Sequence, residues 1–169
     1  MMIDYPSASC FTGDEGCNLV SRVIVLDTGP LGLVTNPRLS AGSVACAQWL
    51  QTHVTVGNRV IIPEIADYEV RRELLRANKT KGIARLDDLA KSLEYLPITT
   101  TAMRQAAQFW AQARQQGQPT AGDKTIDGDM ILVAQAMTLG VPDVVIATTN
   151  VGHLSRFVTA ELWQGIAPS

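Results

Sequence analysis

The sequence contains no apolar run of the roughly 18 or more residues that a membrane-spanning helix requires, although 46% of its 169 residues are hydrophobic. Its longest apolar runs have the length of strands, so we expect a soluble globular protein with no membrane partner. An excess of one charge is also lacking, since 14 Lys and Arg face 16 Asp and Glu and the net charge is −2. Any binding of nucleic acid therefore needs a local basic patch.

Cysteine is scarce. Cys10, Cys17 and Cys46 are odd in number and show no Cys-x-x-Cys spacing. Since the chain also has no secretory hydrophobic region, this pattern favours the reducing cytoplasm as its location. Cys46 falls in a predicted helix, where we expect it to be a small core residue.

The length of 169 residues allows one domain with a sizeable core and is too short for two typical domains. Residues 1–21, "MMIDYPSASCFTGDEGCNLVS", mix Ser, Gly, Asp and Pro without periodicity, which predicts a flexible N-terminal arm and leaves the true start site open. We expect residues 22–169 to form a single domain.

Apolar runs and amphipathic segments alternate along this domain. "RVIVL" at 22–26 is apolar and β-branched, as a strand buried on both faces of a parallel sheet should be. Further strands are predicted at 59–62, 95–99 and 143–149, and helices at 40–53, 64–77, 81–93, 101–116 and 129–139, with a loop over 117–128. This order predicts an α/β protein, a three-layer α/β/α sandwich with a mostly parallel central sheet, whose ligands lie beyond the carboxyl ends of the strands.

Oxygen-bearing side chains gather at those strand ends. Asp27 ends the first strand, Glu69 lies little more than one turn into its helix, and Asn150 directly follows the strand at 143–149. Asp127 and Asp129 open the helix that begins in "DGDMILVAQA". Such side chains, if they converge, suit a hard divalent cation such as Mg²⁺ or Mn²⁺.

Each of these residues also has a purely structural interpretation. Asp27 before Thr-Gly-Pro suits a turn or a helix cap, and Asn150 suits a plain turn. Asp127 suits an N-cap and Asp129 a first-turn acid. Side chains that are two residues apart in a helix point about 200° from each other. We therefore assign Asp129 to the metal and Asp127 to a cap or outer-sphere role.

Four segments together resemble the PIN-domain nucleases, and most closely the toxins of the VapBC type. They are "VIVLDTGPL", "IIPEIADYEVRREL", "DGDMILVAQAM" and "VIATTNVGHLSRF", and the resemblance runs from about residue 22 to residue 166. It implies a PIN-like fold and a metal-dependent endoribonuclease that hydrolyses phosphodiester bonds of single-stranded RNA with Mg²⁺ or Mn²⁺. It also implies a toxin-like role with a cognate antitoxin as partner, and a homodimer.

The resemblance implies a catalytic set of Asp27, Glu69, Asp129 and Asn150, with Thr148 as the threonine that accompanies the fourth position. Asn150 departs from a strict set of four acids, which lowers the charge of the site, although an amide oxygen can still bind a metal or its water. Thr28 and Thr148 are further candidates for substrate binding. No His, Ser or Cys nucleophile is needed, which suits a chain whose two histidines are at positions 53 and 153.

A local basic segment follows the second motif. Between residues 71 and 85 lie six Lys and Arg against one acid, Glu73. We expect Arg72, Arg76 and Lys79, on the polar side of their helix, to contact phosphates in a salt-sensitive manner. A solvated helix face with Glu69–Arg72 and Glu73–Arg76 pairs at i, i+3 is the alternative, and a contact with an antitoxin is another.

Two other functions share features with this sequence. A phosphotransfer enzyme or receiver domain also places an Asp at a strand end, but the second Asp that the phosphatase pattern needs is replaced by Gly29, and the receiver's acidic pair is missing. A non-catalytic PIN-like module that binds RNA or protein is the second alternative, and Asn150 is the residue that keeps it open.

Overall fold

The computed structural model describes residues 22–116 and 123–168, so the predicted arm at 1–21 lies outside the described residues. Five strands form one parallel sheet in the order β3-β2-β1-β4-β5. They are β1 (Val23–Leu26), β2 (Arg59–Pro63), β3 (Glu94–Leu96), β4 (Val144–Thr148) and β5 (Ala160–Leu162). The central strand β1 thus has β2 on one side and β4 on the other.

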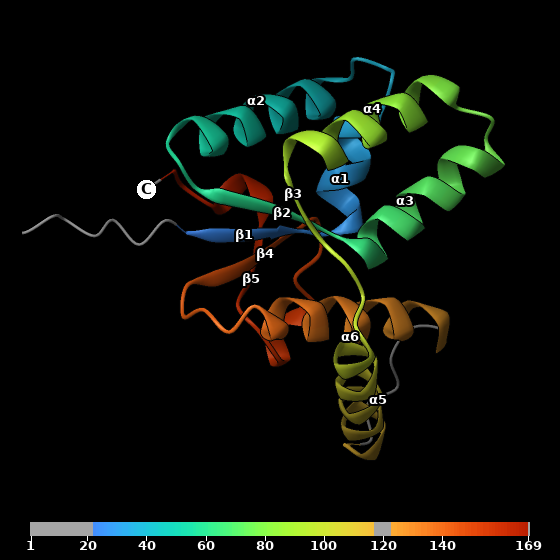
Figure 1. Cartoon of the computed structure of the whole chain (residues 1–169), viewed down its shortest axis with the longest axis vertical. Helices are drawn as coiled ribbons and strands as arrows, with labels where there is room; N and C mark the ends of the chain where they lie inside the picture. Colours follow the sequence, from blue (N-terminus) through green and yellow to red (C-terminus); the bar gives the residue numbers. More distant parts are fainter. Residues whose placement is uncertain (1–21, 117–122, 169) are drawn as a thin grey trace, which may run out of the picture.

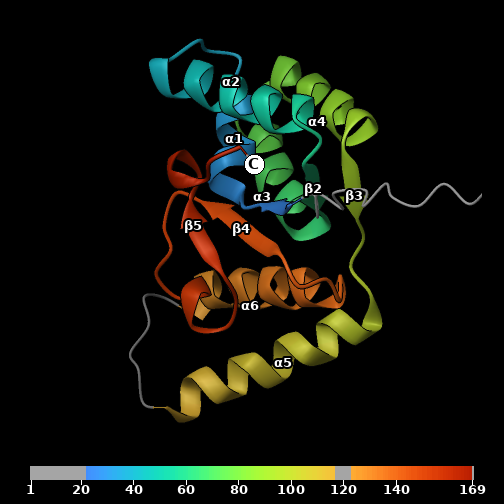
Figure 2. The same cartoon turned by 90° about the vertical axis from the view of Figure 1, so that its left-hand side faces the viewer.

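Six helices in the described ranges cover the two faces of the sheet (Figures 1 and 2). One face carries α1 (Thr28–Thr35), α2 (Ala41–Thr55), α3 (Glu64–Arg76) and α4 (Thr80–Ser92), and the other carries α6 (Asp123–Thr138) with α5 (Thr100–Gln115) outside it. The expected three-layer sandwich is therefore confirmed. None of the helices in the described ranges combines the length and the hydropathy that a membrane span needs.

The alternating side chains of β1 explain its unbroken apolar run. Ile24 and Leu26 belong to the core beneath α1 to α4, whereas Val23 and Val25 belong to the core beneath α6. Because both faces are covered, every position of the strand is buried. Cys46 is also fully buried in the first of these cores, as the sequence predicts.

The structure differs from the sequence predictions in three places. The turn predicted after Asp27 is the helix α1, whose Pro30 lies in the first turn, where a missing N–H costs no helical hydrogen bond. The strand β5 is only three residues long at the sheet edge and gives too short a pattern to predict. Helix α6 begins at Asp123 instead of near Asp127, so Asp127 is not its N-cap and the predicted loop is wrong over 123–128.

Candidate functional site

Asp27 is held between the two central strands at their carboxyl ends. Its backbone N–H donates to the Ala147 carbonyl at 2.9 Å, and its Oδ1 accepts a 2.7 Å hydrogen bond from the backbone N–H of Thr28, which makes it the N-cap of α1. Its Oδ2 accepts a 2.6 Å hydrogen bond from the hydroxyl of Thr148, at the end of β4. The helix-cap interpretation of Asp27 is correct, and it leaves this carboxylate fixed at the sheet edge.

Glu69 reaches the same edge from α3. Its Oε2 accepts a 2.6 Å hydrogen bond from the hydroxyl of Thr28, and its Oε1 lies 3.8 Å from Nη2 of Arg72. A methyl group at Gly128 of α6 would come within 2.6 Å of Oε1. The predicted i, i+3 pair with Arg72 therefore exists, and the same carboxylate also contacts both α1 and α6.

Asp129 of α6 is the third carboxylate at this edge. Its pKa is raised to about 7, mainly by burial and in addition by the negative charges of Asp27 and Glu69. The pKa of Asp27 is also raised, mainly by burial and partly by Glu69, against the lowering effect of its hydrogen bonds from Thr148 and Thr28. The structure therefore brings three acids from β1, α3 and α6 within electrostatic reach of one another.

The donor chemistry of these three acids fits a hard divalent cation. Carboxylate oxygens are the ligands that Mg²⁺ and Mn²⁺ prefer, and a cation would relieve the mutual repulsion that raises the pKa of Asp129. In the parts of the chain that the structure describes, no group of three or more His, Cys, Asp or Glu side chains is arranged so that it could hold a metal ion. The three acids nevertheless have the charge and ligand type for a cation, and hydroxyl groups hold two of them, Asp27 and Glu69.

The other predicted site residues lie differently. Thr148 is fully buried, and its hydroxyl accepts a 3.0 Å hydrogen bond from the backbone N–H of Asn150 while donating to Asp27. The side chain of Asn150 is exposed, and its Oδ1 accepts a 3.2 Å hydrogen bond from the backbone of Gly152, as in a turn. Asp127 is exposed and lines a groove between α5 and α6. Asn150 and Asp127 therefore occupy a turn and a neighbouring groove.

Two glycines that the sequence did not single out as site residues make close approaches here. At Gly128 a side chain would collide with the Glu69 carboxylate, and at Gly29 it would come within 2.4 Å of the Thr149 hydroxyl. These small residues let α6 and the loop after β4 come close to α3 and α1. The position of Gly128 between two acids in "DGD" could have marked it as a site residue. Nothing in the sequence, however, indicates that it lies against Glu69.

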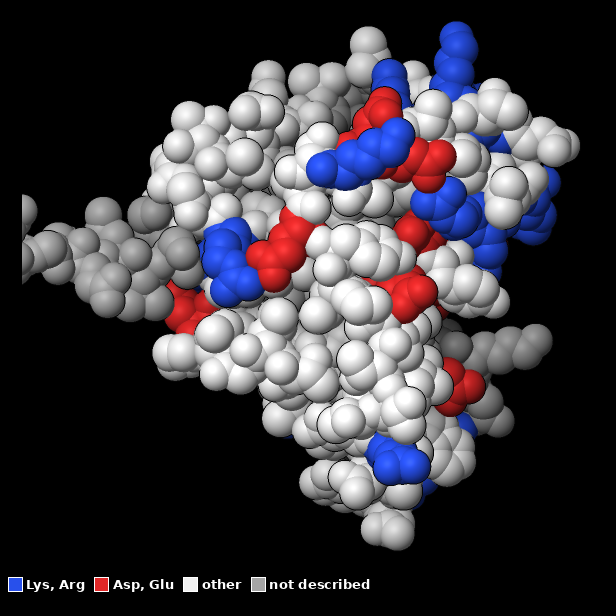
Figure 3. All heavy atoms as spheres, in the orientation of Figure 1, with Lys and Arg blue, Asp and Glu red and all other residues white. Residues whose placement is uncertain are grey.

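The basic side chains lie beside this site, on α3 and α4. Figure 3 shows Lys and Arg gathered over these two helices next to acidic side chains. Arg72 lies over the ring of Tyr68 at 5.4 Å, and Arg76 is exposed and pairs with Glu73 at 2.7 Å. Both predicted i, i+3 pairs are therefore present, although each arginine remains more than half exposed to solvent.

Comparisons with known proteins identify the fold. No protein-family model and no curated protein matches the sequence. Chains in the crystal structure of VapBC2 from Rickettsia felis, bound to a DNA fragment from their promoter, and in VapBC-1 from nontypeable Haemophilus influenzae align with TM-scores of 0.62 and 0.62. These alignments have 15% and 16% sequence identity, and they cover 82% and 84% of this chain and 97% and 98% of the matched chains.

A third solved structure is VapBC-5 from Mycobacterium tuberculosis, described as a member of the VapBC family of toxin–antitoxin systems. It aligns with a TM-score of 0.51 and 19% identity over 83% of this chain and 96% of the matched chain. At such low identity the likeness concerns the fold alone. It confirms the PIN-like α/β/α fold that the sequence motifs imply.

Proposed function

We propose that this protein is a divalent-metal-dependent endoribonuclease that hydrolyses phosphodiester bonds of single-stranded RNA, in the manner of the toxin of a toxin–antitoxin pair. The observation that carries the proposal is the electrostatic coupling of Asp27, Glu69 and Asp129 at the carboxyl end of a parallel sheet. The fold, which it shares with chains of three VapBC structures, supports the same function.

In this proposal Asp27, Glu69 and Asp129 hold Mg²⁺ or Mn²⁺. When bound, such an ion activates water and neutralises charge at the scissile phosphate. Asp129, with a pKa of about 7, carries a proton for part of the time near neutral pH and releases it when the site is loaded. Arg72 and Arg76 attract the phosphate backbone beside the acidic site.

The two threonines act as positioning residues. Thr148 donates its hydroxyl hydrogen to Asp27, and Thr28 donates its own to Glu69. Since each hydroxyl has one hydrogen, neither can donate to the substrate without releasing its carboxylate. We therefore propose that both threonines orient acids, in place of the substrate-binding role expected for them.

The proposed partners follow from the same family of structures. An antitoxin protein is expected to bind the chain, and two copies are expected to form a homodimer in the cytoplasm. Light scattering of the purified chain tests the second expectation directly. A single species with twice the monomer mass would support it, and a monomer mass at micromolar concentration would contradict it.

A non-catalytic binding module is the second candidate, and two observations favour it. Asn150 uses its side-chain oxygen in a turn, and no group of three or more His, Cys, Asp or Glu in the described ranges is arranged so that it could hold a metal ion. Calorimetric titration with Mn²⁺ separates the two functions, because a nuclease site must bind the ion. Absence of binding at millimolar Mn²⁺ would favour the binding module.

The proposed activity is tested with end-labelled single-stranded RNA in Mg²⁺, Mn²⁺ or EDTA. Cutting in either metal and not in EDTA is expected. Turnover of acetyl phosphate or another small phosphomonoester, with RNA left intact, would overturn the proposal in favour of phosphotransfer chemistry.

A further inference from the structure

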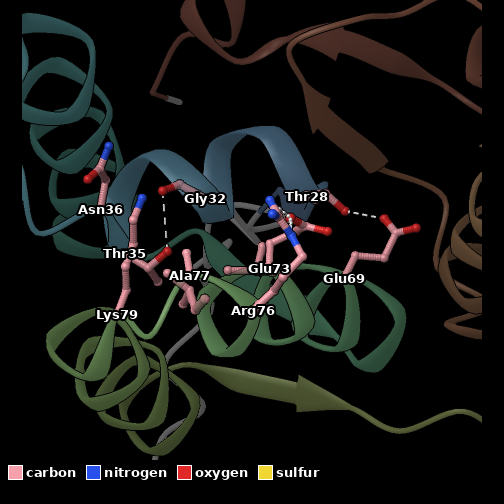
Figure 4. Close-up of a pocket in the computed structure, with 11 residues that line it drawn as sticks. Thr28, Gly32, Thr35, Asn36, Glu69, Glu73, Arg76, Ala77 and Lys79 are labelled. Atoms are coloured by element: carbon pink, nitrogen blue, oxygen red, sulfur yellow. Dashed lines mark hydrogen bonds and ion pairs between the residues drawn. The ribbon is translucent and has the colours of Figure 1, made fainter.

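A groove runs between α1 and α3 from the candidate site to a basic end (Figure 4). Thr28 and Glu69 line one end, and Asn36 and Lys79 line the other. Its volume is about 260 Å³. Because two of its lining residues are the bonded pair at the candidate site, whatever occupies the groove also reaches that site.

The charge of the groove changes sign along its length. Glu69 lies at one end and Lys79 at the other, and Glu73 and Arg76 line the stretch between them (Figure 4). Glu73 and Arg76 pair with each other at 2.7 Å, so together they add no net charge to the middle of the groove. Arg85 of α4 adds charge nearby, since its Nη1 donates to the carbonyl of Asn36. This arrangement suits a polyanion that is cut at one end of the groove and held at the other.

The wall formed by α1 is open at Gly32. A Cβ built at Gly32 meets no heavy atom within 4 Å, so a side chain there would extend into open space along the groove. In contrast, a Cβ at Gly82 would lie 2.7 Å from the Leu74 side chain, because α4 packs tightly behind α3. The open width of the groove thus depends on the missing side chain at position 32.

We propose that this groove binds the sugar–phosphate backbone of single-stranded RNA beside the point of cleavage, with Lys79 and Arg76 contacting a phosphate. The inference rests on the proposed function, since it assigns the path of that substrate. It adds Gly32 to the binding surface and gives Lys79, already a predicted phosphate contact, a place at the far end of the groove. It also predicts that filling the groove blocks RNA without disturbing the acidic site.

The test compares Gly32→Leu and Lys79→Gln with the wild type. Gly42→Leu is the matched control, because Gly42 is an exposed helical glycine whose Cβ would come no closer than 3.9 Å to a Leu33 side chain. Binding of a fluorescein-labelled, mixed-sequence 12-nucleotide RNA is followed by anisotropy in EDTA. We expect Gly32→Leu and Lys79→Gln to weaken binding at least fivefold and the control to bind like the wild type.

The salt dependence of binding and the hydrolysis of a small diester test the groove assignment further. Lys79→Gln should reduce the slope of log K against log salt by about 0.7 for one lost phosphate contact. In Mn²⁺, Gly32→Leu should cut RNA at least tenfold more slowly and still hydrolyse bis(p-nitrophenyl) phosphate like the wild type, because this diester does not extend along the groove. Equal loss on both substrates would overturn the inference, since it would place the defect in the acidic site.

Three further outcomes overturn the groove assignment: RNA binding that is equal in all four proteins, no RNA binding by the wild type, or displacement of RNA by a polyglutamate peptide as readily as by unlabelled RNA. The last would assign the groove to an acidic protein segment. If RNA binds with the expected sensitivity to both substitutions but no phosphodiester is cut in any metal, the groove assignment stands and the proposed nuclease function fails.

Discussion

The hydroxyl of Thr28 donates a 2.6 Å hydrogen bond to Oε2 of Glu69, which joins the first residue of α1 to the middle of α3. The preceding residue, Asp27, is held by Thr148 of β4 at the same distance of 2.6 Å. Each of these two consecutive residues therefore takes part in a bond between a hydroxyl and a carboxylate: Thr28 holds Glu69, and Asp27 is held by Thr148. This pair of hydroxyl contacts organises the candidate site and gives its most direct structural tests.

Thr148→Val removes the hydroxyl that holds Asp27. Thr148 is fully buried, so the substitution leaves a carboxylate oxygen and the backbone N–H of Asn150 without this partner. We expect a loss of about 1–3 kcal/mol in the free energy of unfolding and at least a tenfold loss of RNA cleavage. Urea unfolding and a cleavage assay measure the two effects. Thr148→Ser keeps the hydroxyl and should restore most of both, whereas full activity of Thr148→Val would contradict the positioning role.

Gly128→Ala tests how closely α6 approaches Glu69. The new methyl group would lie 2.6 Å from Oε1, so the carboxylate must move. Replacing glycine by alanine inside a helix ordinarily stabilises it by roughly 0.5–1 kcal/mol. We therefore expect Gly128→Ala to stay folded, by circular dichroism, while its affinity for Mn²⁺ in calorimetry falls at least tenfold.

Gly42→Ala is the matched control for this prediction, because the added methyl group there makes only ordinary contact with Leu33. It should gain stability and bind Mn²⁺ like the wild type. Unchanged Mn²⁺ affinity in Gly128→Ala would show that Glu69 does not depend on the glycine.

The sheet and its acids were predictable, because their signals are local. The apolar run of β1, with Asp27 directly after it, is a pattern in consecutive residues, and so is the amphipathic helix that carries Glu69. Helix α1 was missed because Gly29, Pro30 and Gly32 locally favour a turn, whereas capping by Asp27 and burial of Leu31 favour the helix.

The early start of α6 was missed for a related reason. Gly128 has low helix propensity and so predicts a break in a helix. In the structure it lies inside α6 and packs against Glu69 of α3, a contact between segments that are far apart in the sequence. Likewise, the Thr28–Glu69 and Thr148–Asp27 bonds join residues 41 and 121 positions apart. Contacts of this kind depend on how the helices pack, which no local pattern in one sequence specifies.

Asp129→Asn tests the charge of the site through pH. The folded-state pKa of Asp129 is raised from 3.8 to about 7, so its stability contribution is fully present below about pH 4 and is lost as the pH rises towards 7. In EDTA, Asp129→Asn should therefore melt a few degrees above the wild type at pH 8, and this difference should shrink as the pH falls towards 4.

The same two proteins in Mn²⁺ provide the control. The ion should raise the melting temperature of the wild type at pH 8, because it binds the folded state, and should have a much smaller effect on Asp129→Asn. Melting curves by circular dichroism across this pH range measure both differences. A variant that is no more stable than the wild type at pH 8 in EDTA would contradict the proposed crowding of charge.

Cleavage of end-labelled single-stranded RNA by the wild type and by Asp27→Asn, purified side by side, shows whether the carboxylate of Asp27 holds a catalytic cation. Asparagine keeps the shape and the capping oxygen of Asp27 but removes the charge that holds the cation. We expect cutting by the wild type in Mg²⁺ or Mn²⁺, none in EDTA, and at least a hundredfold slower cutting by Asp27→Asn. Cutting that persists in EDTA, or that is equal in the two proteins, would contradict it.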